Sequence, residues 1–195
     1  MVATLRSRIE AGLGQERPAF GLYDPEAPAR LTPMEPLEEL LQVPVRVVSW
    51  YQAWGSAQAA CPLAALESTA QQGRLPLITW EPWTHPLELP PAAAPAQQPD
   101  YSLARLLTGA YDTYIRSWAR ALSAWGQPVL LRPLHEMNGD WYPWGGTVNG
   151  NRPQEFVQVW HHLRRLFQEE GAKAVQWVWC PYALSVPDRE DNALE

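Results

Sequence analysis

Short apolar runs alternate with helical patterns, and this alternation constrains the fold more than any other feature. The runs are near-continuous in Val, Leu, Ile and Trp, which is typical of strands that are buried on both faces. They cover residues 19–23, 44–50, 75–80, 128–134 and 174–180. Because strands that alternate with helices pair in parallel through right-handed crossovers, the order predicts an α/β protein with a parallel sheet.

Helices are predicted between these strands, at residues 37–41, 62–72, 103–125 and from Pro153 to a stop before Gly171. In the third segment apolar residues recur every three or four positions, and Gly126 ends the pattern. Trp118, Trp125 and Trp160 lie on the apolar stripes of these helices and are predicted core residues, as is Trp177 in the last strand. The proline-rich stretch 85–100 is predicted to be a surface loop.

Composition excludes several classes of protein. The chain of 195 residues has 15 basic and 21 acidic residues and a net charge of −6, which argues against a nucleic-acid partner. No apolar run approaches the ~18 residues that a membrane-spanning helix needs. Cys61 and Cys180 are too few for a disulfide framework and are predicted to be small apolar residues. The 11 tryptophans favour carbohydrate binding, but only weakly.

The histidines do not predict a metal site. A zinc-protease pair needs His at i and i+4 on a helix, whereas His135 is followed at that spacing by Gly139 in a strand context. His161 and His162 are adjacent on a predicted helix and point roughly 100° apart, so they cannot share one ion. They are predicted to be surface or half-buried residues, and His85 an ordinary loop residue. No metal or cofactor is predicted.

Polar and aromatic residues follow all five predicted strands. These clusters are Tyr23-Asp24, residues 50–54, residues 80–83, residues 135–141 and residues 179–182. In a (β/α)8 barrel, catalytic groups lie at the carboxyl ends of the strands. The agreement among the five ends predicts a functional site at this edge of the sheet.

The sharpest segment is LRPLHEMNGDWYPWGG at residues 131–146, which begins in a strand and leaves it at Glu136. This carboxyl group stands beside His135 and among Trp141, Tyr142 and Trp144. Burial by such neighbours raises a carboxyl pKa and can keep the group protonated near neutral pH. A protonated carboxyl is what glycoside hydrolysis needs to protonate the glycosidic oxygen, and aromatic rings stack on sugars.

The string RPLHEMNGDWYPWG closely resembles the acid/base signature of glycoside hydrolase family 26. The resemblance extends to residues 21–24, 78–82, 109–112 and 177–181, and so covers about residues 18–182. This family contains β-mannanases, with some enzymes for β-glucan and β-xylan. The resemblance implies a (β/α)8 TIM-type barrel that hydrolyses β-1,4-linked polysaccharide, mannan above all, with retention of configuration.

The resemblance also implies roles for individual residues. Glu136 matches the acid/base, His135 the neighbour that holds active-site hydrogen bonds, and Trp141 an aromatic near the cleavage point. Arg132 is expected to orient the carboxylates from within the strand. The residues expected to bind substrate are His135, Trp141, Trp80, Glu81, Trp83, Asn138, Tyr142, Trp144, Tyr51 and Trp54.

The sequence departs from the family pattern in its second half. A retaining glycosidase needs a second carboxylate about 5–5.5 Å from the first, and in this family it is a Glu at the end of the seventh strand. The sequence shows only about five β/α units, so an incomplete barrel without that nucleophile is predicted. Tyr182 stands where the family often has Asn. Replacement of the nucleophile by Glu81 is a weaker hypothesis.

Three explanations of the short barrel stay open at this point. The chain could be part of a longer protein, a second copy or another polypeptide could complete the barrel, or the chain could be a non-catalytic carbohydrate-binding remnant. The expected organisation is an N-terminal segment at 1–17, a partial barrel domain at 18–182 and a polar tail at 183–195. Open sheet edges would favour self-association. No secretory signal is visible, and localisation stays open.

Overall fold

Parallel pairing of five strands organises the protein, as the alternation predicts. The computed structural model describes residues 20–56, 59–188 and 190–192, so the predicted segment 1–17 lies outside the described residues. The strands are β1 (Phe20–Tyr23), β2 (Val45–Ala53), β3 (Leu75–Glu81), β4 (Val129–Pro133) and β5 (Val175–Trp177). They form one sheet in the order β1-β2-β3-β4-β5, with every neighbouring pair parallel.

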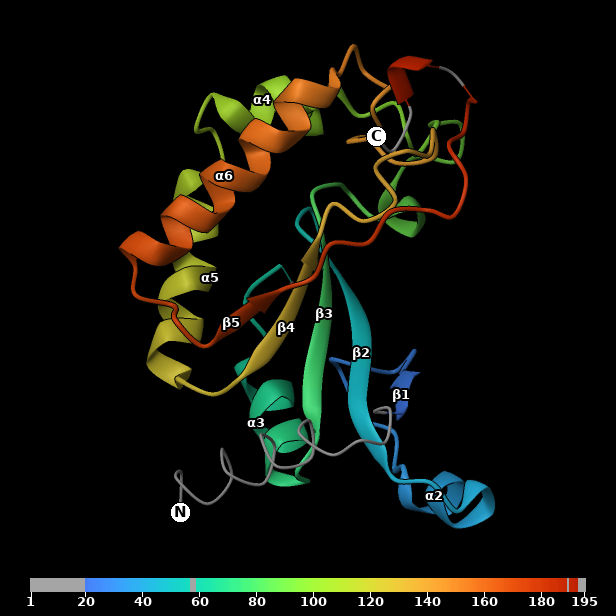
Figure 1. Cartoon of the computed structure of the whole chain (residues 1–195), viewed down its shortest axis with the longest axis vertical. Coiled ribbons are helices and arrows are strands. Elements are labelled where there is room, and N and C mark those ends of the chain that lie inside the picture. Colours follow the sequence, from blue (N-terminus) through green and yellow to red (C-terminus); the bar gives the residue numbers. More distant parts are fainter. Residues whose placement is uncertain (1–19, 57–58, 189, 193–195) are drawn as a thin grey trace.

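The described α-helices connect these strands. They are α2 (Glu35–Leu41), α3 (Leu63–Gln71), α4 (Leu103–Leu107), α5 (Asp112–Trp125) and α6 (Pro153–Glu169), with short 3-10 turns η1 (Pro86–Glu88), η2 (Pro99–Tyr101) and η3 (Glu190–Asn192). Figure 1 shows α4, α5 and α6 gathered on one side of the sheet and α2 beside β1. Pro153 opens α6 and Gly126 ends α5 with a φ of 69°, as their positions in the sequence predict.

The predicted helix over residues 103–125 is two helices, which corrects the sequence expectation. Gly109 adopts a φ of 80° between α4 and α5, a conformation that breaks a helix and that glycine adopts without steric cost. Leu106 and Ile115 are buried in the same core on either side of the break. The apolar period therefore continues through the turn, and the pattern alone does not reveal it.

The register of the parallel strands decides which side chains share a face of the sheet. Tyr51 pairs with Thr79, and Thr79 with Arg132. The Arg132 guanidinium donates to Thr79 Oγ1 at 2.9 Å and lies 5.9 Å from the centre of the Tyr51 ring. The helices cover the opposite face, so we call the face that carries these three residues the open face.

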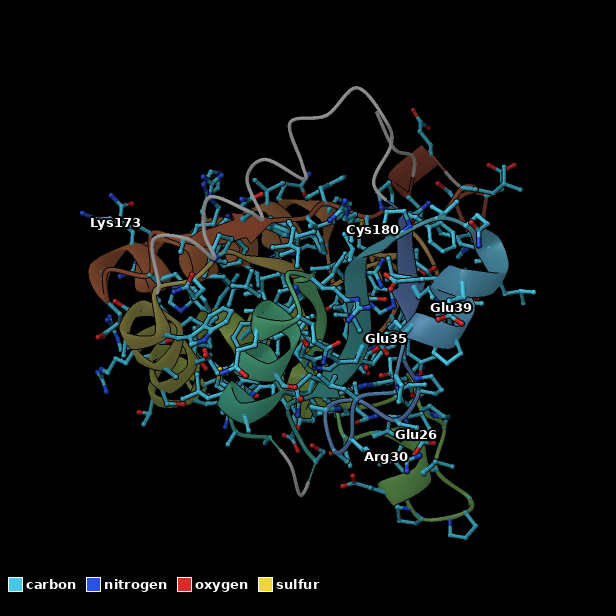
Figure 2. All side chains as sticks on the ribbon, turned by 90° about the horizontal axis from the view of Figure 1, so that it is seen from below. Glu26, Arg30, Glu35, Glu39, Lys173 and Cys180 are labelled. Carbon is cyan, nitrogen blue, oxygen red and sulfur yellow. The ribbon has the colours of Figure 1, made fainter. Side chains whose placement is uncertain are left out.

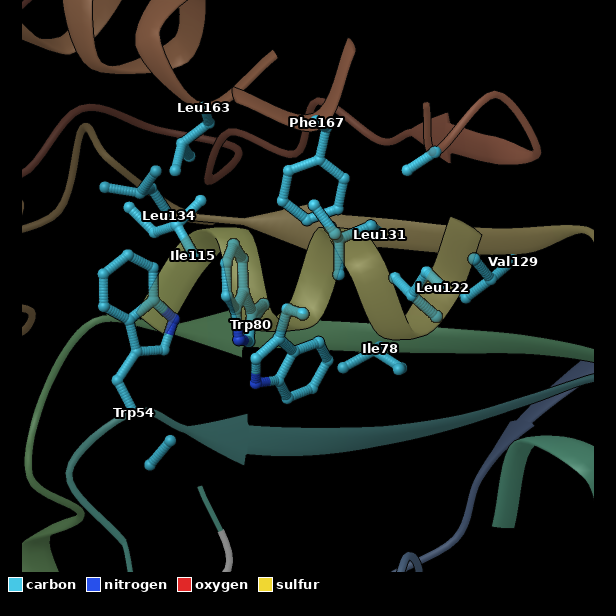
Figure 3. Close-up of a cluster of buried hydrophobic side chains, with 14 of the residues drawn as sticks. Trp54, Ile78, Trp80, Ile115, Leu122, Val129, Leu131, Leu134, Leu163 and Phe167 are labelled. Carbon is cyan, nitrogen blue, oxygen red and sulfur yellow. The ribbon is translucent and has the colours of Figure 1, made fainter. Parts of the chain in front are cut away.

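The core lies between the sheet and the helices. Figure 3 shows Ile78 and Leu131 of the sheet facing Ile115, Leu122 and Phe167 of the helices, with Trp80 among them. All of these side chains are buried. Alternate residues of the strands enter this core, while their neighbours form the open face.

The predicted core tryptophans differ in depth. Trp118 is fully buried, which confirms the prediction for this residue. Trp125, Trp160 and Trp177 are only partly buried, at the margin of the core. The Trp125 indole donates to the surface carboxylate of Glu67 at 2.9 Å, and Trp160 packs against Trp177 beside the edge strand β5.

The described part of the predicted tail packs back onto the protein. In Figure 1 the red segment after β5 runs past the ends of β4 and β3. The Val186 N–H donates to the carbonyl of Asn138 at 2.8 Å, and the buried Asn192 side chain donates to the same carbonyl at 2.9 Å. Val186 and Asn192 are therefore held against the loop after β4.

Several charged side chains lie at the periphery. Figure 2 shows Glu35 and Glu39 on α2, with Lys173 at the other end of the molecule and Glu26 beside Arg30. The Glu26–Arg30 pair is 3.6 Å apart and exposed, so it contributes at most about 1 kcal/mol. The edge strands β1 and β5 each have one partner in the described sheet, and self-association through them stays a prediction.

Candidate active site

Side chains from consecutive strand ends meet at the carboxyl edge of the open face. Tyr51 comes from β2, Glu81 from β3, and His135 and Glu136 from the loop after β4. The His135 ring lies 5.6 Å from the Tyr51 ring, and its Nε2 is 4.0 Å from Glu81 Oε1. Because parallel strands end at the same edge, residues far apart in the sequence converge there, as predicted.

The turn after β4 has a backbone that non-glycine residues rarely adopt. Leu134 has a φ of 49° and Glu136 a φ of 53°. Each such conformation costs about 1 to 3 kcal/mol and persists only where the surroundings hold it. Strained backbone of this kind clusters at functional sites, and here it surrounds His135.

Two hydrogen bonds hold this turn. The Glu136 N–H donates to the carbonyl of Cys180, which follows β5 and is labelled in Figure 2, at 2.6 Å. The Trp144 indole donates to the carbonyl of His135 at 2.7 Å. The loop after β5 and the Trp144 indole therefore hold the backbone of this turn from two sides.

The Glu136 carboxylate is held by a neighbouring indole. Trp141 Nε1 donates to Glu136 Oε2 at 3.0 Å, and both side chains are only partly buried. The indole lies so close to Gly139 that a Cβ on that residue would overlap it. The glycine in the string HEMNGDW is therefore required for Trp141 to reach the carboxylate.

Glu81 is the most deeply buried carboxyl group of the site, with 2% of its surface exposed. Burial raises its pKa to about 8, although the Trp83 indole at 3.3 Å and the charge of Arg132 act in the opposite direction. The group is therefore protonated at neutral pH. A protonated carboxyl can donate as well as accept a hydrogen bond.

His135 is buried and neutral. Burial, followed by the positive charge of Arg132, lowers its pKa to about 3. Its Nε2 shares a hydrogen bond of 2.9 Å with the Tyr142 hydroxyl, while its Nδ1 has no partner among the described residues. His135 therefore contributes hydrogen bonds and shape to the site and no charge.

Both carboxyl groups of the site act on the pKa of its tyrosines. Burial raises the pKa of Tyr51 and of Tyr142. The charge of Arg132 acts to lower both pKa values, and the charges of Glu81 and Glu136 act to raise them. Both phenols are therefore neutral hydrogen-bonding groups at physiological pH. Arg132 was expected to orient the carboxylates, but its guanidinium donates to Thr79 and acts on Glu81 through its charge alone.

Trp54 and Trp80 are not at the site, which corrects the expectation that they bind substrate. Trp80 is 0% exposed and points to the helix face, where its ring lies 5.1 Å from that of Trp118. Trp54 is buried against Trp80 and Tyr114 at 4.6 and 5.2 Å between ring centres. Alternate residues of a strand face opposite ways, so Trp80 cannot share the face of Glu81.

Three other residues that were expected to bind substrate are buried instead. Trp144 is fully buried and stacks on Tyr142, with ring centres 4.5 Å apart and an angle of 7° between the ring planes. Trp83 is buried against the same pair. The buried Asn138 bonds the backbone of the loop after β5. The structure corrects the predicted roles of Trp144 and Asn138 to support of the loop.

Two residues of the open face were not among those expected to bind substrate. Tyr23 at the end of β1 is 56% exposed, and its ring lies edge-on to Tyr51 with centres 5.4 Å apart. Thr79 holds the Arg132 side chain. The signal for Tyr23 was present, because the residue ends a predicted strand, whereas the Thr79 contact needs the strand register.

Other predictions concern groups outside the site. No group of three or more His, Cys, Asp or Glu able to hold a metal occurs in the described part of the chain. Cys61 and Cys180 are both free and half-buried, and burial raises the pKa of Cys61 to about 12. His161 is exposed and the half-buried His162 bonds Asp112 at 2.7 Å, as predicted for surface histidines. None of the described helices is long and apolar enough to span a membrane.

A parallel sheet with helical crossovers and a polar site at its carboxyl edge is the arrangement found in (β/α) barrels. The sequence profile described as Glycosyl hydrolase family 26 matches residues 95–192, which is just over half of the chain. The chain therefore belongs to glycosyl hydrolase family 26.

Two relatives of known description match parts of the chain. Endoglucanase H of Acetivibrio thermocellus is 32% identical over 115 residues, which are 58% of this chain and 11% of that protein. A mannan endo-1,4-beta-mannosidase of Bacillus subtilis strain 168 is 36% identical over 63 residues, 30% of this chain and 17% of that enzyme. The chain thus spans less than a fifth of the length of either relative.

Solved structures confirm the fold. The GH26A protein of Muricauda sp. MAR_2010_75 has a TM-score of 0.58 at 20% identity, and the match covers 91% of this chain and 61% of that one. The GH26-CBM35 beta-(1,4)-mannanase of Podospora anserina has a TM-score of 0.60 at 18% identity, covering 97% and 45%. The predicted fold, about five units of a (β/α)8 barrel, is therefore confirmed.

Proposed function

We propose that this chain carries the acid/base half of a retaining β-glycan hydrolase, with Glu136 as the acid/base and β-1,4-mannan as the favoured substrate. The observation that carries the proposal is the Trp141–Glu136 hydrogen bond of 3.0 Å at the carboxyl edge of the open face. Membership of the family supports the reaction class, and the mannan endo-1,4-beta-mannosidases among the relatives support the substrate.

In this account Glu136 first donates its proton to the glycosidic oxygen as the bond to the leaving sugar breaks. It later takes a proton from the water that releases the glycosyl group. The Trp141 indole fixes Oε2, so that Oε1 faces the glycosidic oxygen. The reaction needs no metal or organic cofactor.

The nucleophile must be a carboxylate about 5–5.5 Å from Glu136. Glu81 is a poor candidate, because its carboxyl group is buried, bonded to Trp83 and protonated at neutral pH. We assign the nucleophile to a strand outside the five described here, as the family resemblance implies. Glu81 and His135 instead form a neutral hydrogen-bonding wall of the site.

Sugar rings would stack on the exposed aromatics of the open face. Tyr51 is 41% exposed and stands edge-on to both Tyr23 and His135. Tyr51 lies close enough to the acid/base for the charge of Glu136 to act on its hydroxyl, and a flat ring there can cover the apolar face of a pyranose. We infer that Tyr23 and Tyr51 line the sugar-binding surface on the β1 side of Glu136.

A second candidate function is carbohydrate binding without hydrolysis. It is favoured by the same exposed rings together with the protonated state of Glu81, which offers no second carboxylate in the described site. It predicts micromolar-to-millimolar binding of manno-oligosaccharides with no product formed. Calorimetry that detects no heat with any β-linked oligosaccharide would exclude it.

The test is sugar release from galactomannan by the purified chain, with sedimentation to fix its mass. A folded chain that releases no sugar is an incomplete catalytic domain or a binding remnant. Glu136→Gln removes the acid/base, and Glu88→Gln is the matched control because Glu88 is exposed on η1. Hydrolysis lost only in Glu136→Gln supports the proposal, and the mass then shows whether one or two copies act. Hydrolysis that survives in Glu136→Gln contradicts it.

A further inference from the structure

The loop after β5 is fastened to the loop after β4 through Asn138. The Asn138 side chain accepts from the Tyr182 N–H at 2.8 Å and donates to the carbonyls of Tyr182 and Leu184 at 3.1 and 3.2 Å. Its own carbonyl accepts from Val186. Because Asn138 is buried, these bonds are shielded from water, and the backbone at Tyr182 has a fixed position.

The fixed backbone presents the Tyr182 ring to Trp141. The two rings meet edge to face, with centres 4.9 Å apart and 85° between their planes, which is a favoured aromatic geometry. Trp141 in turn donates to Glu136 Oε2. A continuous set of contacts therefore runs from Asn138 through Tyr182 and Trp141 to the carboxylate.

This ring is a feature of the particular sequence. Tyr182 follows the string WVWCP, at the position where the family resemblance would place Asn. Its side chain is 41% exposed, so burial in the core does not account for a tyrosine there. The structural role of this tyrosine is therefore the packing of its ring against Trp141.

We propose that Tyr182 is a positioning residue for the acid/base: clamped by Asn138, its ring holds the Trp141 indole in the orientation that bonds Glu136. The inference rests on the proposed function for its catalytic meaning, but the geometric claim does not require activity. Removing the ring lets the Trp141 indole turn away, and the carboxylate then loses its partner.

The test is the nuclear magnetic resonance signal of the Trp141 indole in the full chain labelled with 15N-tryptophan. Trp141→Phe identifies the signal, and Glu136→Gln shows which part of its pH dependence comes from the carboxylate. The buried Trp118 indole, which donates to the Ala59 carbonyl at 2.8 Å, reports that the fold is intact. Leu184→Ala is the control, because Leu184 is in the same loop and its side chain is 71% exposed.

In Tyr182→Ala the Trp141 signal should lose its response to the titration of Glu136, while the Trp118 signal stays in place. Tyr182→Phe and Leu184→Ala should behave as the parent, since both keep the ring and the backbone clamp. Asn138→Ala should reproduce the effect of Tyr182→Ala. If Tyr182→Ala does not fold, Tyr182→Leu keeps apolar bulk without the ring and should give the same loss.

A Trp141 signal that keeps its pH response in a folded Tyr182→Ala or Tyr182→Leu protein overturns the positioning role and leaves the proposed function standing. A parent signal that Glu136→Gln does not change shows that the Trp141–Glu136 bond is absent. That result overturns the positioning role and also removes the observation on which the proposed function rests.

Discussion

The indole of Trp141 and the carboxylate of Glu136 are joined by a hydrogen bond of 3.0 Å, from Nε1 to Oε2. The two residues are five positions apart in a turn whose backbone is strained at Glu136. Gly139 between them makes the approach possible. This bond ties the proposed acid/base to the aromatic residues around it.

Trp141→Phe tests the importance of that bond. A hydrogen bond to a charged group contributes about 1.5–3 kcal/mol, so hydrolysis of galactomannan, measured as kcat/KM, should fall roughly 10-fold or more. Trp125→Phe removes the same kind of bond, from Trp125 to Glu67 at 2.9 Å on the protein surface, and should leave hydrolysis unchanged. Equal activity in the two variants would show that the Trp141 bond has no part in the reaction.

Glu81→Gln tests the protonated state of the buried carboxyl. The folded-state pKa of Glu81 is raised to about 8, so from pH 4.5 to pH 8 the unfolded chain ionises a group that stays protonated in the fold. The unfolded state then binds fewer protons, and the free energy of unfolding falls as pH rises through this window. Glu81→Gln should remove that fall.

His135 has the opposite effect at lower pH. Its folded-state pKa is lowered to about 3 from 6.5, so His135 makes the free energy of unfolding rise with pH between these values. Above pH 6.5 His135 causes no further change of the free energy of unfolding with pH. Urea unfolding between pH 6.5 and 8 therefore isolates Glu81. A parent protein whose stability does not fall relative to Glu81→Gln across that window would show that Glu81 is ionised in the fold.

Trp80→Ala and Tyr51→Ala compare the loss of a core side chain with the loss of a side chain of the candidate site. Trp80 is fully buried on the helix face, and its loss should lower the free energy of unfolding by about 3–5 kcal/mol. Tyr51 is exposed on the open face, so Tyr51→Ala should cost about 1 kcal/mol or less in stability while weakening the binding of oligosaccharide. Urea unfolding and calorimetry check the two expectations, and the reverse pattern would contradict the assignment of faces.

Much of the fold could be predicted from the sequence, because apolar periodicity reports burial directly. The five strands and their parallel order follow from the alternation. The break at Gly109 could not be seen, since both helices around it bury residues in the same core. Strand ends were also misjudged: β2 continues to Ala53, and β5 ends at Trp177 where only β4 pairs with it.

The candidate site was only partly predictable, for a physical reason. Glu81, His135 and Tyr51 gather at the predicted edge because strand ends converge. The direction in which a side chain points depends on strand parity and on turn geometry, and composition does not report either. Trp80 was therefore placed at the site although it faces the core, and Asn138 was placed on substrate although it bonds the loop after β5.

The most direct test of the central claim compares leaving groups in the Glu136→Ala variant, measured in a complete barrel that also supplies the nucleophile. A β-mannoside with a poor leaving group needs a proton from the acid, so kcat/KM should fall by roughly 10²- to 10⁴-fold relative to the parent. An activated aryl mannoside leaves without that proton and should lose far less in the bond-breaking step. Equal losses on the two substrates would contradict the assignment of Glu136 as the acid/base.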